Sequence, residues 1–172
     1  MKALRIAKYA VLASFVVAIV LFLHYNLPRT DVVQIVGTDI KRTDSNKKDE
    51  VATRDVRFIT SIMRNGKTRV YRNEDTGWGW PPYFKFNSAD LTGQAQSLAS
   101  ETEKPWVLVT YYGWRSTVLS LFPNAIGIEK VDKDYRHLPL FNIFFLLALA
   151  IGAFFLVRRV RKNRSAVGAT RE

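Results

Sequence analysis

The stretch YAVLASFVVAIVLFL at residues 9–23 lacks a polar helix face, and a second such run, LPLFNIFFLLALAIGAFFLV, occupies residues 138–157. About 19 residues, from position 7 to 25, give roughly 28 Å of helix at 1.5 Å each, enough to cross a hydrocarbon core of about 30 Å. A domain this small cannot surround two helices that are apolar on every side. The sequence therefore predicts transmembrane helices at 9–25 and 138–157.

The first run also has the basic start of a cleaved signal peptide. The residues that follow it read HYNLP at 24–28, without the small-x-small pattern of a cleavage site. The apolar core is long for a signal as well. We therefore expect an uncleaved anchor.

Basic residues flank both runs on the side that faces a chain end. They are Lys2, Arg5, Lys8, Arg158, Arg159, Arg161, Lys162 and Arg164. Basic clusters close to span ends stay in the cytoplasm. This predicts cytoplasmic tails at 1–8 and 158–172, and a middle domain at 26–137 that lies outside the cytoplasm.

The net charge of +11 is concentrated beside the predicted membrane. The first tail carries +3, the last tail +5 and the long middle segment only +3. Such tails are attracted to anionic lipid head groups, so we expect the lipid bilayer as a partner and no nucleic acid.

The middle segment is predicted to be rich in β-strands. A Val- and Ile-rich strand at 30–41 precedes a charged loop at 43–55, and 56–73 has the pattern of a hairpin around Asn65-Gly66. A three-residue loop with Gly66 in the left-handed conformation pairs Ile62 with Thr68 and Thr60 with Val70. This register keeps the apolar residues Val56, Phe58 and Ile62 together on one face.

One helix and further strands follow. Residues 88–101 predict a helix capped by Asn87 or Ser88, with Leu91, Ala95 and Leu98 on one face. Strands are predicted at 106–112, 115–122 and 125–131. The fold class is thus a membrane-anchored α+β chain, in which two transmembrane helices flank a small antiparallel β-rich domain. Its order fits an OB-like, partly open barrel, or equally a sheet with one helix packed on it.

The stretch DTGWGWPPYFKF at 75–86 combines five aromatic residues with Gly and Pro. It has three interpretations: an aromatic binding platform, a contact with the membrane interface, or a loop that completes the core. A second aromatic group beside an arginine stands at 111–115. The candidate ligand-binding residues are Trp78, Trp80, Tyr83, Trp114 and Arg115.

Several catalytic chemistries lack their residues. The chain has no cysteine, and its two histidines, His24 and His137, stand at predicted span ends. No metal-ligand spacing, phosphate-binding loop or nucleophile elbow is present in the sequence, so we expect no metal and no cofactor. A pair of acid–base carboxylates would have to come from the acids nearest the aromatic residues. These are Glu74, Asp75, Asp90, Glu101 and Glu103.

Four blocks carry a resemblance to a known family: VVQIVGTDIKRTD (32–44), DVRFI (55–59), VYRNEDTGWGWPPYFKFNSADL (70–91), and VTYYGWRS followed by LFPNAI (109–126). Nearly the whole chain resembles an uncharacterised bacterial family of small two-span membrane proteins, catalogued only as a domain of unknown function. The resemblance implies the inner membrane of a Gram-negative bacterium. It implies no activity, cofactor or catalytic residue.

Three functional hypotheses follow. The first is a non-enzymatic inner-membrane protein whose periplasmic domain binds another envelope protein, a glycan or a lipid. The second is a hydrolase of cell-envelope glycan or lipid head groups, with Asp75 or Asp90 as the acid–base residue. The third is a subunit of an oligomeric pore or membrane complex.

Overall fold

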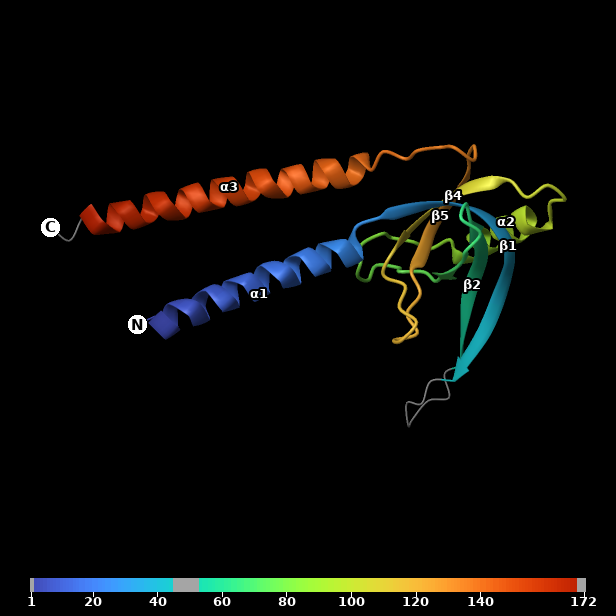
Figure 1. Cartoon of the computed structure of the whole chain (residues 1–172), viewed down its shortest axis with the longest axis horizontal. Coiled ribbons are helices and arrows are strands. Elements are labelled where there is room, and N and C mark those ends of the chain that lie inside the picture. The colour runs from blue at the N-terminus through green and yellow to red at the C-terminus, as the bar shows by residue number, and fades with distance from the viewer. Residues whose placement is uncertain (1, 45–52, 170–172) are drawn as a thin grey trace. The chain divides into compact units, whose positions relative to one another are not determined.

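The computed structural model describes the backbone of residues 2–44 and 53–169 and the side chains of residues 5–42 and 55–163. It divides into two units (Figure 1). The first, residues 1–136, contains helix α1 (Lys2–Asn26), a five-stranded barrel and helix α2 (Ser88–Ser100). The second, residues 137–172, contains helix α3 (Leu140–Ala169). Most of the charged loop predicted at 43–55 lies outside the described residues.

The strands form a closed barrel in the order β1-β2-β3-β5-β4. They are β1 (Arg29–Asp44), β2 (Thr53–Met63), β3 (Thr68–Asn73), β4 (Trp106–Tyr112) and β5 (Asn124–Lys130). The long strand β1 pairs with β4 along its first part and with β2 along the rest, and a register shift lies between Ile35 and Gly37. This strand order, with a helix between β3 and β4, is that of the OB type. The structure confirms a five-stranded barrel, but this barrel is closed and not partly open as predicted, and the alternative of a sheet with one helix is wrong.

The barrel closes where β3 meets β5. A single parallel pair, Arg72 with Asn124, joins the two strands, and the Arg72 amide donates to the Pro123 carbonyl at 2.8 Å. The remaining strand pairs are antiparallel. This pair lies near the end of β3 and at the start of β5, so the two strands touch at one point only.

The core fills the barrel and continues onto α2. Leu91, Ala95 and Leu98 of α2 are buried, as their spacing predicts. They pack with the inward side chains of the strands, which include Val33, Ile35, Ile59, Tyr71, Val107, Val109, Tyr111, Ala125 and Ile128. On β2 the inward face is thus that of Ile59 and Ser61, while Phe58 lies on the other face against Phe122, with ring centroids 5.1 Å apart.

The hairpin between β2 and β3 has the predicted register. Ile62 pairs with Thr68 and Thr60 pairs with Val70. Gly66 has a φ of 78°, the left-handed conformation that the three-residue loop requires.

The strand predicted at 115–122 is wrong. Only Ser116 and Leu121 form an isolated bridge there, and the residues between them turn back sharply. Arg115 holds this turn by donating to the carbonyls of Ser116 (3.0 Å) and Leu121 (2.9 Å). Backbone groups that pair within the segment are not available to a neighbouring strand.

The two apolar helices are longer than the apolar runs. By length and composition alone, segments within both are able to cross a membrane: Arg5–Asn26, with a mean hydropathy of 2.4, and Leu140–Asn163, with 2.6. The residues predicted as separate basic tails continue these helices from residue 2 and up to residue 169. The side chains of Lys2 and Arg164 lie outside the described side chains.

Candidate functional site

Two loops of the barrel pack against the last turn of α1. We call this region the foot of the barrel; it comprises residues 22–26 of α1, the loop 74–87 and the loop 113–123. Only Leu27 and Pro28 separate α1 from β1. Figure 1 shows both loops beside the end of α1 that leads into β1.

The loop 74–87 contacts the helix through two of the predicted site residues. Trp80 stacks on Phe22 with ring centroids 5.6 Å apart, and its indole N–H donates to Asn26 Oδ1 at 2.9 Å. The Tyr83 hydroxyl donates to the Asn26 carbonyl, and its ring stacks on Tyr112 at 4.9 Å. Trp and Tyr suit this position because each has an apolar body and a polar tip.

The loop 113–123 contacts the helix through Trp114. Its indole N–H donates to His24 Nδ1 at 2.8 Å, and its ring meets Tyr25 edge-on at 5.3 Å. The Gly113 amide donates to the Tyr25 carbonyl at 2.9 Å. Gly113 has a φ of 91°, which a residue with a Cβ rarely adopts. Trp80, Tyr83 and Trp114 thus meet around one helix end.

The other two predicted site residues lie away from this contact. Trp78 is 83% exposed and packs edge-on against Phe84 and Phe86, each at 5.5 Å. Arg115 lies over Phe122, with Cζ 4.2 Å from the ring centroid. Ligand binding by the five residues stays a prediction.

A cavity of about 220 Å³ opens at the foot of the barrel. Four aromatic rings and several polar side chains line it, namely Tyr25, Arg72, Glu74, Asp75, Thr76, Trp80, Tyr112, Phe122 and Asn124. Glu74 forms an ion pair with Arg72. Asn124 fixes the Glu74 backbone by accepting from its amide and donating to its carbonyl, both at 2.9 Å. The cavity therefore has fixed walls.

Asp75 links the cavity to α2. Its carboxylate accepts from the Ser88 amide at 2.9 Å and from the Ser88 hydroxyl at 2.7 Å. These bonds satisfy a free N–H of the first turn of α2, which the predicted cap Asn87 leaves without a side-chain bond. The negative charge also favours this end of the helix. Asp75 holds the loop 74–87 on α2.

Lys85 is the buried cation of this loop, and sequence reasoning missed it. Only 4% of the residue is exposed, and its ammonium donates to Asn73 Oδ1 and, at 3.4 Å, to the Glu74 carbonyl. Burial lowers the pKa of Lys85 to about 8, while the charge of Asp75 acts in the opposite direction. Asn73 in turn donates to Ser88 and Thr92 of α2. Lys85 thus joins the loop to β3 and α2.

The remaining predicted carboxylates are dispersed. Asp90 is exposed in the first turn of α2, and Glu101 pairs with Lys130 at 3.0 Å. Glu103 is exposed between α2 and β4. Among the described residues, no three His, Asp or Glu side chains gather as a group that could hold a metal ion.

Comparisons with known proteins place the chain in a family. The family described as "Protein of unknown function (DUF1523)" matches residues 4–164. An "Uncharacterized protein" of Haemophilus influenzae is 42% identical over 118 residues, which are 64% of this chain and 66% of that relative, just under two thirds of its length. No solved structure matches. The chain belongs to the DUF1523 family.

Proposed function

We propose that the chain is a membrane-anchored binding module without catalytic activity, located in the inner membrane of a bacterium. Helices α1 and α3 cross the membrane, and the barrel stands at its periplasmic face. There the barrel captures another envelope protein, a glycan or a lipid.

One observation carries this proposal. The candidate span Arg5–Asn26 of α1 is apolar, no residue of its 18-residue apolar window is buried, and it leads into β1 across two residues. An apolar helix of this length without protein cover is stable in a bilayer and costly in water. Contact between the foot of the barrel and the last turn of α1 supports a position of the barrel directly at the membrane surface.

The basic residues support the orientation. Arg5 and Lys8 stand near the start of α1, and Arg158, Arg159, Arg161 and Lys162 stand in the second half of α3. Because basic clusters beside spans are usually retained in the cytoplasm, these residues support a barrel on the opposite side of the membrane.

The binding surface we propose is the foot of the barrel. Its cavity combines aromatic rings, which stack on sugar rings or aliphatic head groups, with carboxylate, guanidinium and amide groups. A polar ligand from the cell envelope would find both aromatic stacking and hydrogen-bonding groups in this cavity.

A thiol-labelling experiment tests the topology, because the natural chain contains no cysteine. One variant carries Gln96→Cys on the exposed face of α2, and the other carries a cysteine added after Glu172. A membrane-impermeant maleimide is expected to label the first in intact spheroplasts and the second only after lysis. Labelling of the added cysteine in intact cells, with Gln96→Cys protected, would disprove the orientation.

A hydrolase is the second candidate, and the cavity favours it. Glu74 and Asp75 both line a space with aromatic walls, and glycosidases cleave their substrates with a pair of carboxylates in such a cleft. Purified chain in detergent is incubated with cell-wall glycan or phospholipid, beside Asp75→Asn as control. Product release by the natural chain alone supports the hydrolase, and equal background release by both removes it.

A further inference from the structure

We infer that the two loops at the foot of the barrel insert their tips into the lipid head-group layer of the leaflet that α1 leaves. The tips are residues 78–86 and residues 116–121. This inference rests on the proposed function, since it requires α1 to cross the bilayer.

Both tips expose large apolar side chains. Trp78 is 83% exposed, Val118 is 91% exposed and Leu119 is 68% exposed. Phe84 and Phe86 are also more than half exposed. Apolar groups gathered on one side of a folded domain mark a contact surface, and indole side chains concentrate at membrane interfaces.

The turn 116–121 is built to present its apolar residues. The amides of Ser116 and Leu121 each donate to the other's carbonyl, at 3.2 and 2.9 Å. The Ser116 hydroxyl accepts from the Leu119 amide at 3.2 Å. Four amides of this turn, those of Ser116, Leu119, Ser120 and Leu121, donate within it, which lowers the cost of its entry into a less polar layer.

The other tip is organised around Trp78. Its ring packs edge-on against Phe84 and Phe86, and the Gly77 amide donates to the Lys85 carbonyl at 3.1 Å. Trp78, Phe84 and Phe86 therefore form one apolar cluster on a loop that Lys85 and Asp75 hold in place.

Continuity with α1 selects lipid as the occupant. Trp80, within the first tip, stacks on Phe22, and Trp114, two residues before the second tip, donates to His24. Both tips therefore adjoin the last turn of α1. When α1 crosses the bilayer, that turn lies at head-group level. The tips then meet lipid before they meet another protein.

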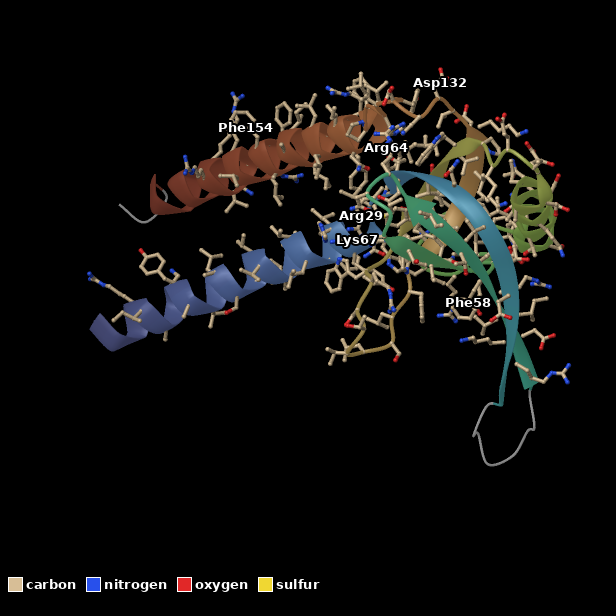
Figure 2. All side chains as sticks on the ribbon, turned by 45° about the vertical axis from the view of Figure 1, so that its right-hand side comes forward. Arg29, Phe58, Arg64, Lys67, Asp132 and Phe154 are labelled. Atoms are coloured by element: carbon tan, nitrogen blue, oxygen red, sulfur yellow. The ribbon has the colours of Figure 1, made fainter. Side chains whose placement is uncertain are left out.

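Spin labels on single cysteines test the insertion in the full chain, reconstituted in liposomes of phosphatidylethanolamine and phosphatidylglycerol. Labels replace Trp78 and Val118 at the tips, Leu12 in α1 and Gln96 on α2, which lies away from α1 in both views (Figures 1 and 2). Collisions with oxygen, which concentrates in lipid, are compared with collisions with a water-soluble nickel chelate. Circular dichroism confirms that each variant is folded.

The expected result is several-fold fewer nickel collisions at Trp78→Cys and Val118→Cys than at Gln96→Cys. Oxygen collisions at the two tip labels should be retained. The label at Leu12→Cys should lie deeper in the bilayer than either tip label. If the label at Leu12→Cys lies deep while both tip labels collide with nickel as often as the label at Gln96→Cys, the insertion of the tips is disproved. The proposal that α1 anchors the chain in the membrane would then still stand. If Leu12→Cys itself is exposed to nickel, the proposed function fails. Tips shielded from both oxygen and nickel would indicate a protein contact and would overturn the inference.

Discussion

Replacing Lys85 by methionine is expected to remove a rise in stability at mildly alkaline pH. Burial lowers the pKa of Lys85 from its ordinary value of 10.5 to about 8 in the folded chain. Between these two values the unfolded chain binds the proton and the folded chain does not, so the free energy of unfolding increases with pH. The stabilisation is complete above 10.5 and is lost as the pH falls through 8.

The magnitude follows from the two pKa values. At about 1.4 kcal/mol per pH unit, the full effect is about 3 kcal/mol, of which about 2 kcal/mol develops between pH 7 and 9.5. Methionine has a similar length and no charge, so Lys85→Met should be flat over this range. The variant also leaves Asn73 Oδ1 without its donor, a cost of about 1 kcal/mol that does not depend on pH and so leaves its profile flat.

Urea unfolding of the full chain in detergent micelles, followed by tryptophan fluorescence, measures this difference. Lys130→Met is the matched control, because Lys130 is exposed and pairs only with Glu101 on the surface. The control should show the same rise as the natural chain. Parallel pH profiles for the natural chain and Lys85→Met would refute the argument that Lys85 loses its proton in the folded state.

Three further predictions concern the barrel. Ile59→Ala removes a fully buried side chain from the core, and chemical denaturation should show a loss of about 3 kcal/mol; a loss below about 1 kcal/mol would contradict the described packing. Asp75→Ala removes both bonds to Ser88 and should cost about 1–2 kcal/mol, with faster amide exchange in the first turn of α2 but not in β2; unchanged exchange there would show that Asp75 does not cap the helix. Burial raises the pKa of Tyr83 to about 12 and also raises the pKa of Tyr112, so the stabilisation from these neutral phenols should be complete below pH 10 and decline as the pH rises toward 12. Spectrophotometric titration of Tyr83→Phe should show one phenol fewer ionising above pH 10 than in the natural chain. An unchanged titration would contradict the burial of Tyr83.

Local patterns predicted most of the elements. Asn65-Gly66 determined both the turn and the register of the β2–β3 hairpin, because a left-handed glycine fixes which residues pair. The helix at α2 followed from the spacing of Leu91, Ala95 and Leu98. Such features depend on residues only a few positions apart, so they can be predicted from a single sequence.

Features that depend on residues far away in the chain were harder to predict from the sequence. Barrel closure rests on one pair between Arg72 and Asn124, 52 positions apart, and neither residue carries a local signal for it. On β2 both faces contain apolar residues, so alternation did not show that Ile59 points inward and Phe58 outward. The segment 115–122 has strand-like composition, but its backbone pairs within itself.

The candidate site was predicted in part. Composition singled out Trp80, Tyr83 and Trp114, and the fold brings all three to one helix end. Their partners His24 and Asn26 lie more than 50 positions away. His24 was assigned only to a span end, and Asn26 only to the start of the middle domain. Lys85 gave no signal, because the burial of a lysine is decided by the loop that folds over it.

The connection of two residues between α1 and β1 couples the orientation of the barrel to the orientation of the helix. A helix of 25 residues is about 37 Å long, and spanning helices tilt by about 20° on average, which moves one end sideways by about 13 Å relative to the other. Because Trp80, Tyr83 and Trp114 all bond to the last turn of α1, we expect the barrel to follow such a tilt, and also a rotation of α1 about its axis. If α1 spans the membrane as proposed, the direction in which the barrel faces would depend on what α1 packs against in the bilayer. A change in helix packing would then turn the barrel without any change in its own fold.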